Sequence, residues 1–263
     1  MILRHAVQVG ALGVFVGFAA LPTGRAAEPA LPVKPAISEE AGTAVSRMGE
    51  TLLAKELSFT AKTISVYLDQ SGQPLHIFHT MNVVLRRPDR LAIQVTGDDG
   101  SHDLFYDGTS VSIFFPDSKQ YAVMAAPGDI PSALNEVLAK LDFDFPLVDF
   151  FTASSDKTLL SGAIAGCQVG TARIDGVECR HLLFTQGAGI DMELWVEKNG
   201  AAIPHRLIVT YRLLPGQPNF IAEFTNWNTR VRPSDSEFAF QPPTGVKKIE
   251  LSQEVAPGRE GTK

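Results

Sequence analysis

The six histidines are the residues of this chain with the most obvious capacity for chemistry. His76, His79 and His102 fall close together in the sequence, and imidazole is a common ligand of zinc and copper. Residues 75–86 alternate as a strand does, so positions 76 and 79 point to opposite faces and cannot share one ion. His181 and His205 stand singly on predicted strands. We therefore predict structural histidines and no metal site.

The acidic turn at residues 98–103, Asp-Asp-Gly-Ser-His-Asp, is a second candidate. An EF-hand calcium loop needs twelve residues and ends on a bidentate glutamate, and both features are missing here. The Gly-x-Ser-x-Gly, His-Glu-x-x-His and phosphate-loop motifs are missing from the whole sequence. The sequence thus favours a protein that is not an enzyme and holds no cofactor.

Two cysteines, Cys167 and Cys179, could form a disulfide in an exported protein. If the turn at Asp175-Gly176 has two residues, Cys179 faces Ala172 across the hairpin. Cys167 then lies about five residues, or roughly 16 Å, further along the strand. Linked Cα atoms lie within about 7 Å, so a bridge requires residues 161–167 to fold back. A disulfide and two free thiols both stay open.

The N-terminus predicts export. Residues 1–27 combine a basic start, an apolar run and a small-residue exit, as a cleaved signal peptide does. The alternative, a membrane anchor, needs roughly 20 unbroken apolar residues, and Pro22 and Arg25 cut this run short. No cysteine follows the run, so a lipid anchor is not expected. Residues 28–36, rich in Pro and Ala, predict a flexible leader.

The charge argues against polyanionic partners. The whole chain carries a net charge of −6, and removal of Arg4 and Arg25 with the signal leaves 21 basic and 29 acidic residues, a net charge of −8. Nucleic acid and anionic membrane surfaces are poor partners for such a protein.

One domain is predicted over residues 37–251. A capped amphipathic helix is expected at residues 38–55. Strands are expected at residues 58–69, 75–86, 91–96, 103–107, 110–115, 120–124, 168–174, 177–185, 190–197, 202–213 and 219–229. Helical spacing returns in an insertion at about residues 127–160, and residues 252–263 predict a disordered tail. Because short turns join consecutive strands, the pairing is expected to be antiparallel.

A sheet of about eleven strands tends to curl, and the helices can cover its concave face. The predicted fold class is α+β, mostly β: an antiparallel, strongly curved half-barrel with an N-terminal helix and a helical lid. A packed core and a ligand cavity fit the same periodicity. The residues expected to line the interior are Val83, Leu85, Leu91, Ile93, Val95, Leu104, Tyr106, Ile113, Phe115, Leu134, Leu138, Phe150, Phe151, Met192, Leu194, Leu207, Val209 and Phe224.

Local motifs add a resemblance to a known family. Residues 84–91, Val-Leu-Arg-Arg-Pro-Asp-Arg-Leu, and the turn Tyr106-Asp107-Gly108 resemble the outer-membrane lipoprotein carriers, whose half-open barrel holds an acyl chain. The segments 175–182, 194–196, 204–207, 224–228 and 238–243 resemble more closely an uncharacterised family of predicted periplasmic proteins related to that fold. In the carriers, the arginine before the proline holds the lid closed, which implies that Arg87 is the lid latch here. The alternative is that Arg87 is a solvated residue at a strand end.

The resemblance implies a soluble, monomeric periplasmic carrier that shelters a lipid, acyl chain or other hydrophobic molecule between sheet and lid. The alternative is a regulatory or interaction module in which the same sheet recognises an envelope protein. Neither hypothesis requires a membrane anchor, a metal or nucleic acid.

Overall fold

The computed structural model describes residues 36–126, 128–141, 147–151, 157 and 159–251. In the first half, α1 (Glu39–Leu52) precedes β1 (Glu56–Leu68), β2 (Pro74–Arg86), β3 (Arg90–Gly97), β4 (Gly100–Tyr106), β5 (Ser110–Phe115) and β6 (Gln120–Ala125). Then come α2 (Ile130–Leu141) and the 3-10 helix η1 (Val148–Phe151). The second half holds β7 (Ala163–Ile174), β8 (Val177–Gln186), β9 (Ile190–Glu197), β10 (Pro204–Tyr211), β11 (Asn219–Asn228), the 3-10 helix η2 (Asp235–Glu237) and β12 (Lys247–Lys248).

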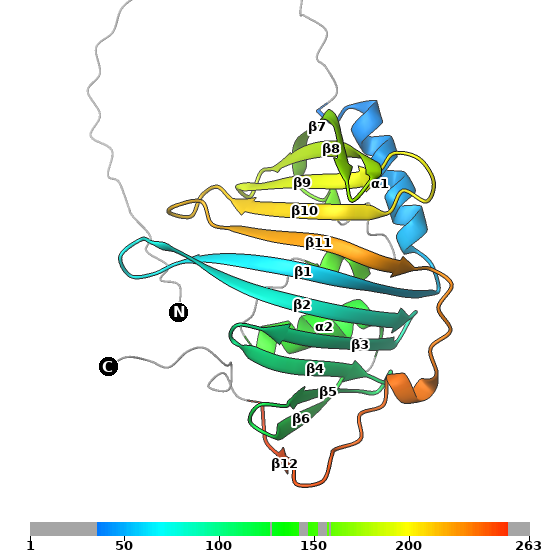
Figure 1. Ribbon diagram of the computed structural model, residues 1–263, viewed down its shortest axis with the longest axis vertical. Helices are drawn as coiled ribbons and strands as arrows, with labels where there is room; N and C mark the ends of the chain where they lie inside the picture. The colour runs from blue at the N-terminus through cyan, green and yellow to red at the C-terminus, as the bar shows by residue number, and fades with distance from the viewer. Residues whose placement is uncertain (1–35, 127, 142–146, 152–156, 158, 252–263) are drawn as a thin grey trace, which may run out of the picture. The chain divides into compact units, whose positions relative to one another are not determined.

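The strands form one sheet in the order β12-β6-β5-β4-β3-β2-β1-β11-β10-β9-β8-β7 (Figure 1). Each half is a meander of consecutive hairpins. β1 pairs with both β2 and β11, so the first half is joined to the second half through β11. All neighbours are antiparallel except β12 and β6, which are parallel. The predicted mostly β, curved antiparallel fold is confirmed.

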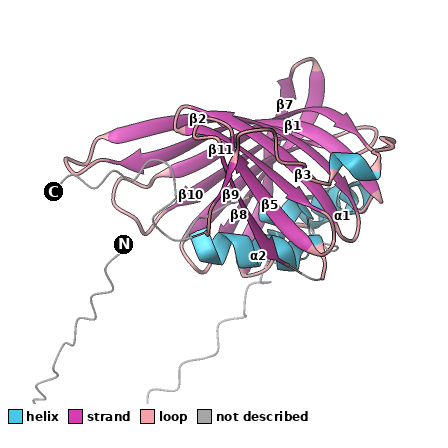
Figure 2. Ribbon diagram, turned by 90° about the horizontal axis from the view of Figure 1, so that it is seen from below, coloured by secondary structure: helices cyan, strands magenta, loops and turns pink. Residues whose placement is uncertain are grey.

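Both helices lie on the same face of the curved sheet (Figure 2). Ser38 caps α1 by accepting a hydrogen bond from the Ala41 amide at 3.3 Å, and the helix buries Val45 and Met48 against the sheet. The α1 residue Arg47 donates to the Gly200 carbonyl in the β9–β10 turn at 3.2 Å. Asp129 caps α2 by accepting from the Ser132 amide at 3.0 Å. The two helices α1 and α2 thus cover the concave face.

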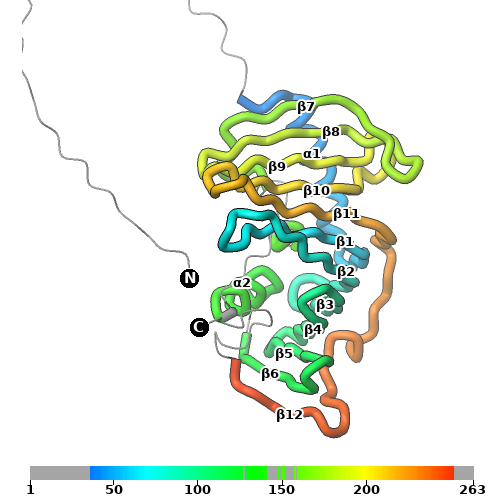
Figure 3. The backbone as a smooth tube through the Cα atoms, turned by 60° about the vertical axis from the view of Figure 1, so that its left-hand side comes forward, coloured from blue at the N-terminus to red at the C-terminus, as the bar shows by residue number. Residues whose placement is uncertain are grey.

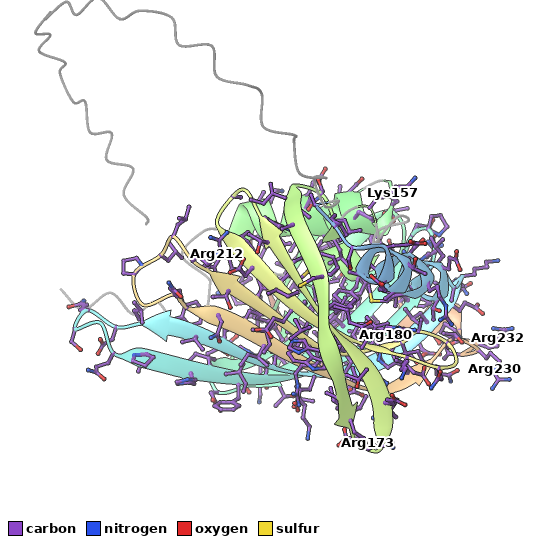
Figure 4. The ribbon with its side chains drawn as sticks, turned by 90° about the horizontal axis from the view of Figure 1, so that it is seen from above. Lys157, Arg173, Arg180, Arg212, Arg230 and Arg232 are labelled. Atoms are coloured by element: carbon purple, nitrogen blue, oxygen red, sulfur yellow. The ribbon has the colours of Figure 1, made fainter. Side chains whose placement is uncertain are left out.

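The outer face of the first half is covered by a segment that the sequence analysis left without a role. Residues 229–251, named the C-terminal strap here, run from β11 through η2 to β12 (Figure 3). Arg232, labelled beside Arg230 in Figure 4, pairs with Glu56 at 2.8 Å. Further along, the Phe240 ring packs against three outer-face rings, those of Phe105, Phe114 and Tyr121, with centroids 5.4 to 5.6 Å away.

The structure corrects several predicted boundaries. β7 begins at Ala163 instead of residue 168, because a bulged run of small residues still pairs with β8 although it lacks clear alternation. β4 begins at Gly100 instead of residue 103, and β10 is shorter than predicted. β12 was missed, since two lysines carry no strand pattern. The predicted signal peptide, most of the leader, parts of the lid insertion and the tail lie outside the described residues.

Candidate ligand-binding site

The residues predicted to line the interior meet in one apolar cluster. On the sheet, the predicted lining residues of β2 to β5 and of β9 to β11 are buried, whereas their neighbours along each strand face outward. The lid residues Leu134, Phe150 and Phe151 are buried against them, and Leu138 packs on the cluster while partly exposed. The predicted set therefore shares one space between sheet and helices.

Aromatic rings fill the part of this space beneath the central strands. The Phe150 ring lies 5.3 Å from that of Phe224, and the Phe59 ring contacts Phe224, Phe151 and Trp227 with centroids 5.9, 6.3 and 4.4 Å away. The sequence analysis missed Phe59 as a lining residue. Its inward position could have been found from the alternation of Leu57, Phe59 and Ala61 along β1. The rings of Phe150 and Phe151 thus pack directly against those of the central strands.

Arg87 joins two helical ends beside this cluster. It follows β2, and its Nη2 donates to the Leu52 carbonyl at the end of α1 at 2.9 Å. The same guanidinium donates to the carbonyls of Phe151 and, at 3.4 Å, of Phe150, both at the end of η1. A planar cation suits several carbonyls at a helix C-terminus. Burial lowers the pKa of Arg87 from its usual value, as expected for a charge held partly away from water.

The start of α2 is fixed at the same end of the sheet. The amide of Ile130 donates to the Pro88 carbonyl at 2.9 Å, and the hydroxyl of buried Tyr106 donates to the Gly128 carbonyl at 2.9 Å. Residue 88 follows Arg87, so the turn between β2 and β3 holds both α2 and η1. This turn contains the Arg-Pro motif on which the resemblance was based.

Polar side chains occur on the inner face further along β1, β2 and β4. Thr63 is 1% exposed, and its hydroxyl has no hydrogen-bond partner among the described residues. Its cross-strand neighbour His79 lies with Nε2 2.7 Å from an Asp99 carboxylate oxygen. Burial and the nearby His79 lower the pKa of His102, with Asp99 acting in the opposite direction. Within the described residues, no group of three or more His, Cys, Asp or Glu side chains could hold a metal ion.

Both cysteines are free in the structure. Cys179 faces Ala172, as a two-residue turn requires, and Cys167 faces Leu183. Cys167 is exposed, whereas Cys179 is buried, and burial followed by the charge of Glu197 raises the pKa of the Cys179 thiol. Of the two alternatives, the structure contains the pair of free thiols.

A hollow of about 690 Å³ lies on the outer face, opposite the helices. Its apolar floor is one cross-strand row, in which β2 contributes Phe78, β1 Ile64, β11 Ile221 and β10 Ile208. Phe78 is 51% exposed. The C-terminal strap covers the outer aromatic rings of β4, β5 and β6 but leaves this row open. This hollow was not predicted from the sequence, because a row of residues across four strands leaves no pattern along any one strand.

A row of mainly polar residues borders the hollow. It contains residues from three of the segments on which the resemblance was based, 175–182, 194–196 and 204–207. The His181 and Trp195 rings stack at 4.0 Å, and the Arg206 guanidinium lies 5.4 Å from the Trp195 centroid. Arg206 also pairs with Glu223 at 2.6 Å. His181 Nε2 lies 2.7 Å from a Glu193 carboxylate oxygen, so this predicted structural histidine is hydrogen-bonded. The motif residues His181, Trp195 and Arg206, from β8, β9 and β10, thus contact one another on the outer face of the sheet.

The open, curved antiparallel sheet, its helical covering and the apolar cluster between them define a mostly β protein with one helix-covered face. Among the described residues, no helix combines the length and the apolar composition needed to cross a membrane. The chain belongs to the family described as predicted periplasmic protein (DUF2092), whose model matches residues 41–252. The periplasmic location predicted from the N-terminus is the one that this description gives.

Several solved structures show a distant similarity to the chain. The lipoprotein LppX of Mycobacterium tuberculosis is 15% identical, with a TM-score of 0.46 over 73% of this chain and 96% of that one. A LolA superfamily protein from Nitrosomonas europaea is 10% identical, with a TM-score of 0.36 over 76% of this chain and 97% of that one. MucB in its complex with MucA from Pseudomonas aeruginosa is 16% identical, with a TM-score of 0.42 over 77% of this chain and 61% of that one. No curated protein sequence matches the chain.

Proposed function

We propose that this chain is a periplasmic binding protein that shelters a hydrophobic molecule, such as a lipid or acyl chain, between the sheet and the lid formed by α2 and η1. The observation that carries the proposal is the position of Arg87. Its guanidinium ties the end of η1 to α1 beside an apolar cluster. A core that never opens would gain little stability from a charged group at this place. This arrangement supports a lid that closes over the interior and can be released.

Binding in this proposal is an exchange of apolar surfaces. When η1 swings away, the rings of Phe150 and Phe151 leave the space beside Phe224, and the ligand replaces them. Each methylene of the ligand that leaves water contributes about 0.8 kcal/mol. The released rings lose a comparable burial, so net affinity stays moderate and the ligand can be handed on.

The test is native mass spectrometry of the protein purified from periplasm without detergent, followed by organic extraction and lipid identification. A stoichiometric adduct in the mass spectrum is the expected result, and the extract would then identify the cargo class. An unliganded mass that also stays unchanged after addition of fatty acids and phospholipids would overturn the proposal, because the interior would then be a permanently filled core.

A second candidate function is recognition of an envelope protein, and the outer-face hollow favours it. The exposed ring of Phe78 beside Ile64 is an apolar surface on the side of the sheet opposite α1 and α2. If this face binds a protein, a partner retained by the wild-type chain is lost with Phe78→Ser, while any lipid adduct persists. Retention of the same partner by both proteins would exclude this surface.

A further inference from the structure

Thr63 is a polar side chain in an apolar place. It lies on β1 with the inward parity of Phe59 and Ala61, is 1% exposed, and finds no hydrogen-bond partner among the described residues. A buried hydroxyl without a partner destabilises a folded protein, whereas valine has almost the same shape without that cost. Thr63 therefore lowers the stability of the unliganded protein, and a hydrogen bond to an oxygen or nitrogen atom of a ligand would remove this loss.

The inner-face neighbours of Thr63 are small on two sides. Its cross-strand neighbour on β11 is Ala222, and the next inward residue along β1 is Ala61, so small side chains flank the hydroxyl. On the other side, the imidazole of His79 is turned toward Asp99 and crosses over Gly97, where an added Cβ would meet the ring at 2.2 Å. His79 thus has its own partner and does not satisfy Thr63.

An apolar path leads from Thr63 into the aromatic cluster. The inward residues between Thr63 and Leu57 are Ala61 and Phe59, and the strand covers roughly 20 Å over these six residue steps. An extended chain lying along this path would place its tail against Phe59 and its end beside the Thr63 hydroxyl. Thr63 can both donate and accept, so it suits a hydroxyl or a carboxyl oxygen.

We propose that Thr63 anchors the polar head of the ligand, and that the cargo is consequently an amphiphile with a hydroxyl or carboxyl head group and not a plain hydrocarbon. This inference rests on the proposed function, since it assigns the head group of a ligand held in the same interior. The apolar tail supplies most of the affinity, and the Thr63 hydroxyl selects the head group and fixes the direction in which the chain enters.

The test compares three probes of equal chain length: dodecanoic acid, 1-dodecanol and dodecane. Binding is followed by tryptophan emission, because Trp227 stacks on Phe59 at 4.4 Å in the interior. In Thr63→Val, the affinity for the acid and for the alcohol should fall about fivefold, which corresponds to about 1 kcal/mol for one hydrogen bond. The affinity for dodecane should not change. Urea unfolding of Thr63→Val should show a midpoint no lower than that of the wild type.

Thr210→Val is the matched control. Thr210 lies on β10 between the inward positions and therefore faces outward, so the same chemical change there should leave all three affinities unchanged. Wild-type affinity of Thr63→Val for both polar probes, or an equal loss for all three, would overturn the anchor while leaving the carrier proposal intact. If none of the probes changes the emission of the wild-type protein, the carrier proposal fails, and the anchor fails with it.

Discussion

Replacing Arg87 with methionine isolates the contribution of the tie between η1 and α1. Methionine keeps much of the length and the apolar stem of the side chain but donates no hydrogen bond. The neighbouring Arg86 provides the control, because adjacent strand residues point to opposite faces. Arg86 pairs with Asp235 and lies 5.3 Å from the Phe238 centroid, so it contacts the C-terminal strap and not η1.

The magnitude follows from the contacts of Arg87. A hydrogen bond donated by a charged group contributes about 1.5–3 kcal/mol, and the bond at 3.4 Å is too long to count fully. The bond to Leu52 joins Arg87 to α1 and persists when η1 opens, so of the two remaining bonds the one to Phe151 is lost, and at the upper figure it contributes about 3 kcal/mol. Removing the half-buried charge recovers about 1 kcal/mol of desolvation cost. The η1 segment should therefore open about 2 kcal/mol more easily in Arg87→Met, which is about 30-fold in population.

Hydrogen exchange measures this opening directly. The Phe150 amide donates to the Leu147 carbonyl at 3.0 Å, so it exchanges only when η1 opens. We expect its exchange to be about 30-fold faster in Arg87→Met and unchanged in Arg86→Met. Ligand release should accelerate in the first variant alone. Equal protection of the Phe150 amide in Arg87→Met and in the wild type would refute the latch and the reasoning that assigns it.

Three further predictions concern other residues. Burial lowers the pKa of His102 below its usual value of 6.5, so the unfolded chain binds more protons and the free energy of unfolding should fall as the pH drops from 7 to about 5. Measured by urea unfolding, this pH-dependent decrease in the free energy of unfolding should be smaller in His102→Asn than in the wild type, whereas His76→Asn should show the wild-type decrease. Asp129→Ala should cost about 1 kcal/mol at neutral pH through loss of the α2 cap. Hydrogen bonds lower the pKa of Asp129, so the difference should disappear in urea unfolding below that pKa. Iodoacetamide should add one label, at Cys167, to the native protein and a second, at Cys179, only after unfolding, whereas no label before reduction would indicate a disulfide.

The sheet could be predicted from the sequence because its information is local. Turn residues at Asp107-Gly108 and Asp175-Gly176 mark hairpin ends, and consecutive hairpins leave little freedom in the order of strands. Alternation along β2 and β3 identifies the inward face, so the apolar residues predicted there are buried together. A local pattern in each strand is sufficient for this part of the fold.

The remaining features depend on contacts between distant segments. Phe240 contacts Phe105, which lies 135 residues earlier in the sequence, and no periodicity in the strap predicts this contact. The isolated hydroxyl of Thr63 is visible only when its neighbours across two strands are known, because threonine is an ordinary residue on a strand. Phe78 and Ile64 likewise form an outer row only through the register of β1 and β2. Such sites can be identified only in the tertiary structure, because the residues that form each of them are distant from one another in the sequence.

The end of β2 shows how a short motif can control both faces of the sheet. Arg86 points outward and binds the strap at Asp235, whereas Arg87 binds η1 and α1 on the inner side. Pro88 then accepts the first amide of α2. Three consecutive residues thus attach the strap, the ends of η1 and α1, and the start of α2 to one strand end. Because η1 is held by side-chain hydrogen bonds while the sheet is held by backbone ladders, the lid should open at a far lower cost than the sheet unfolds, which is the order of stabilities that a carrier needs.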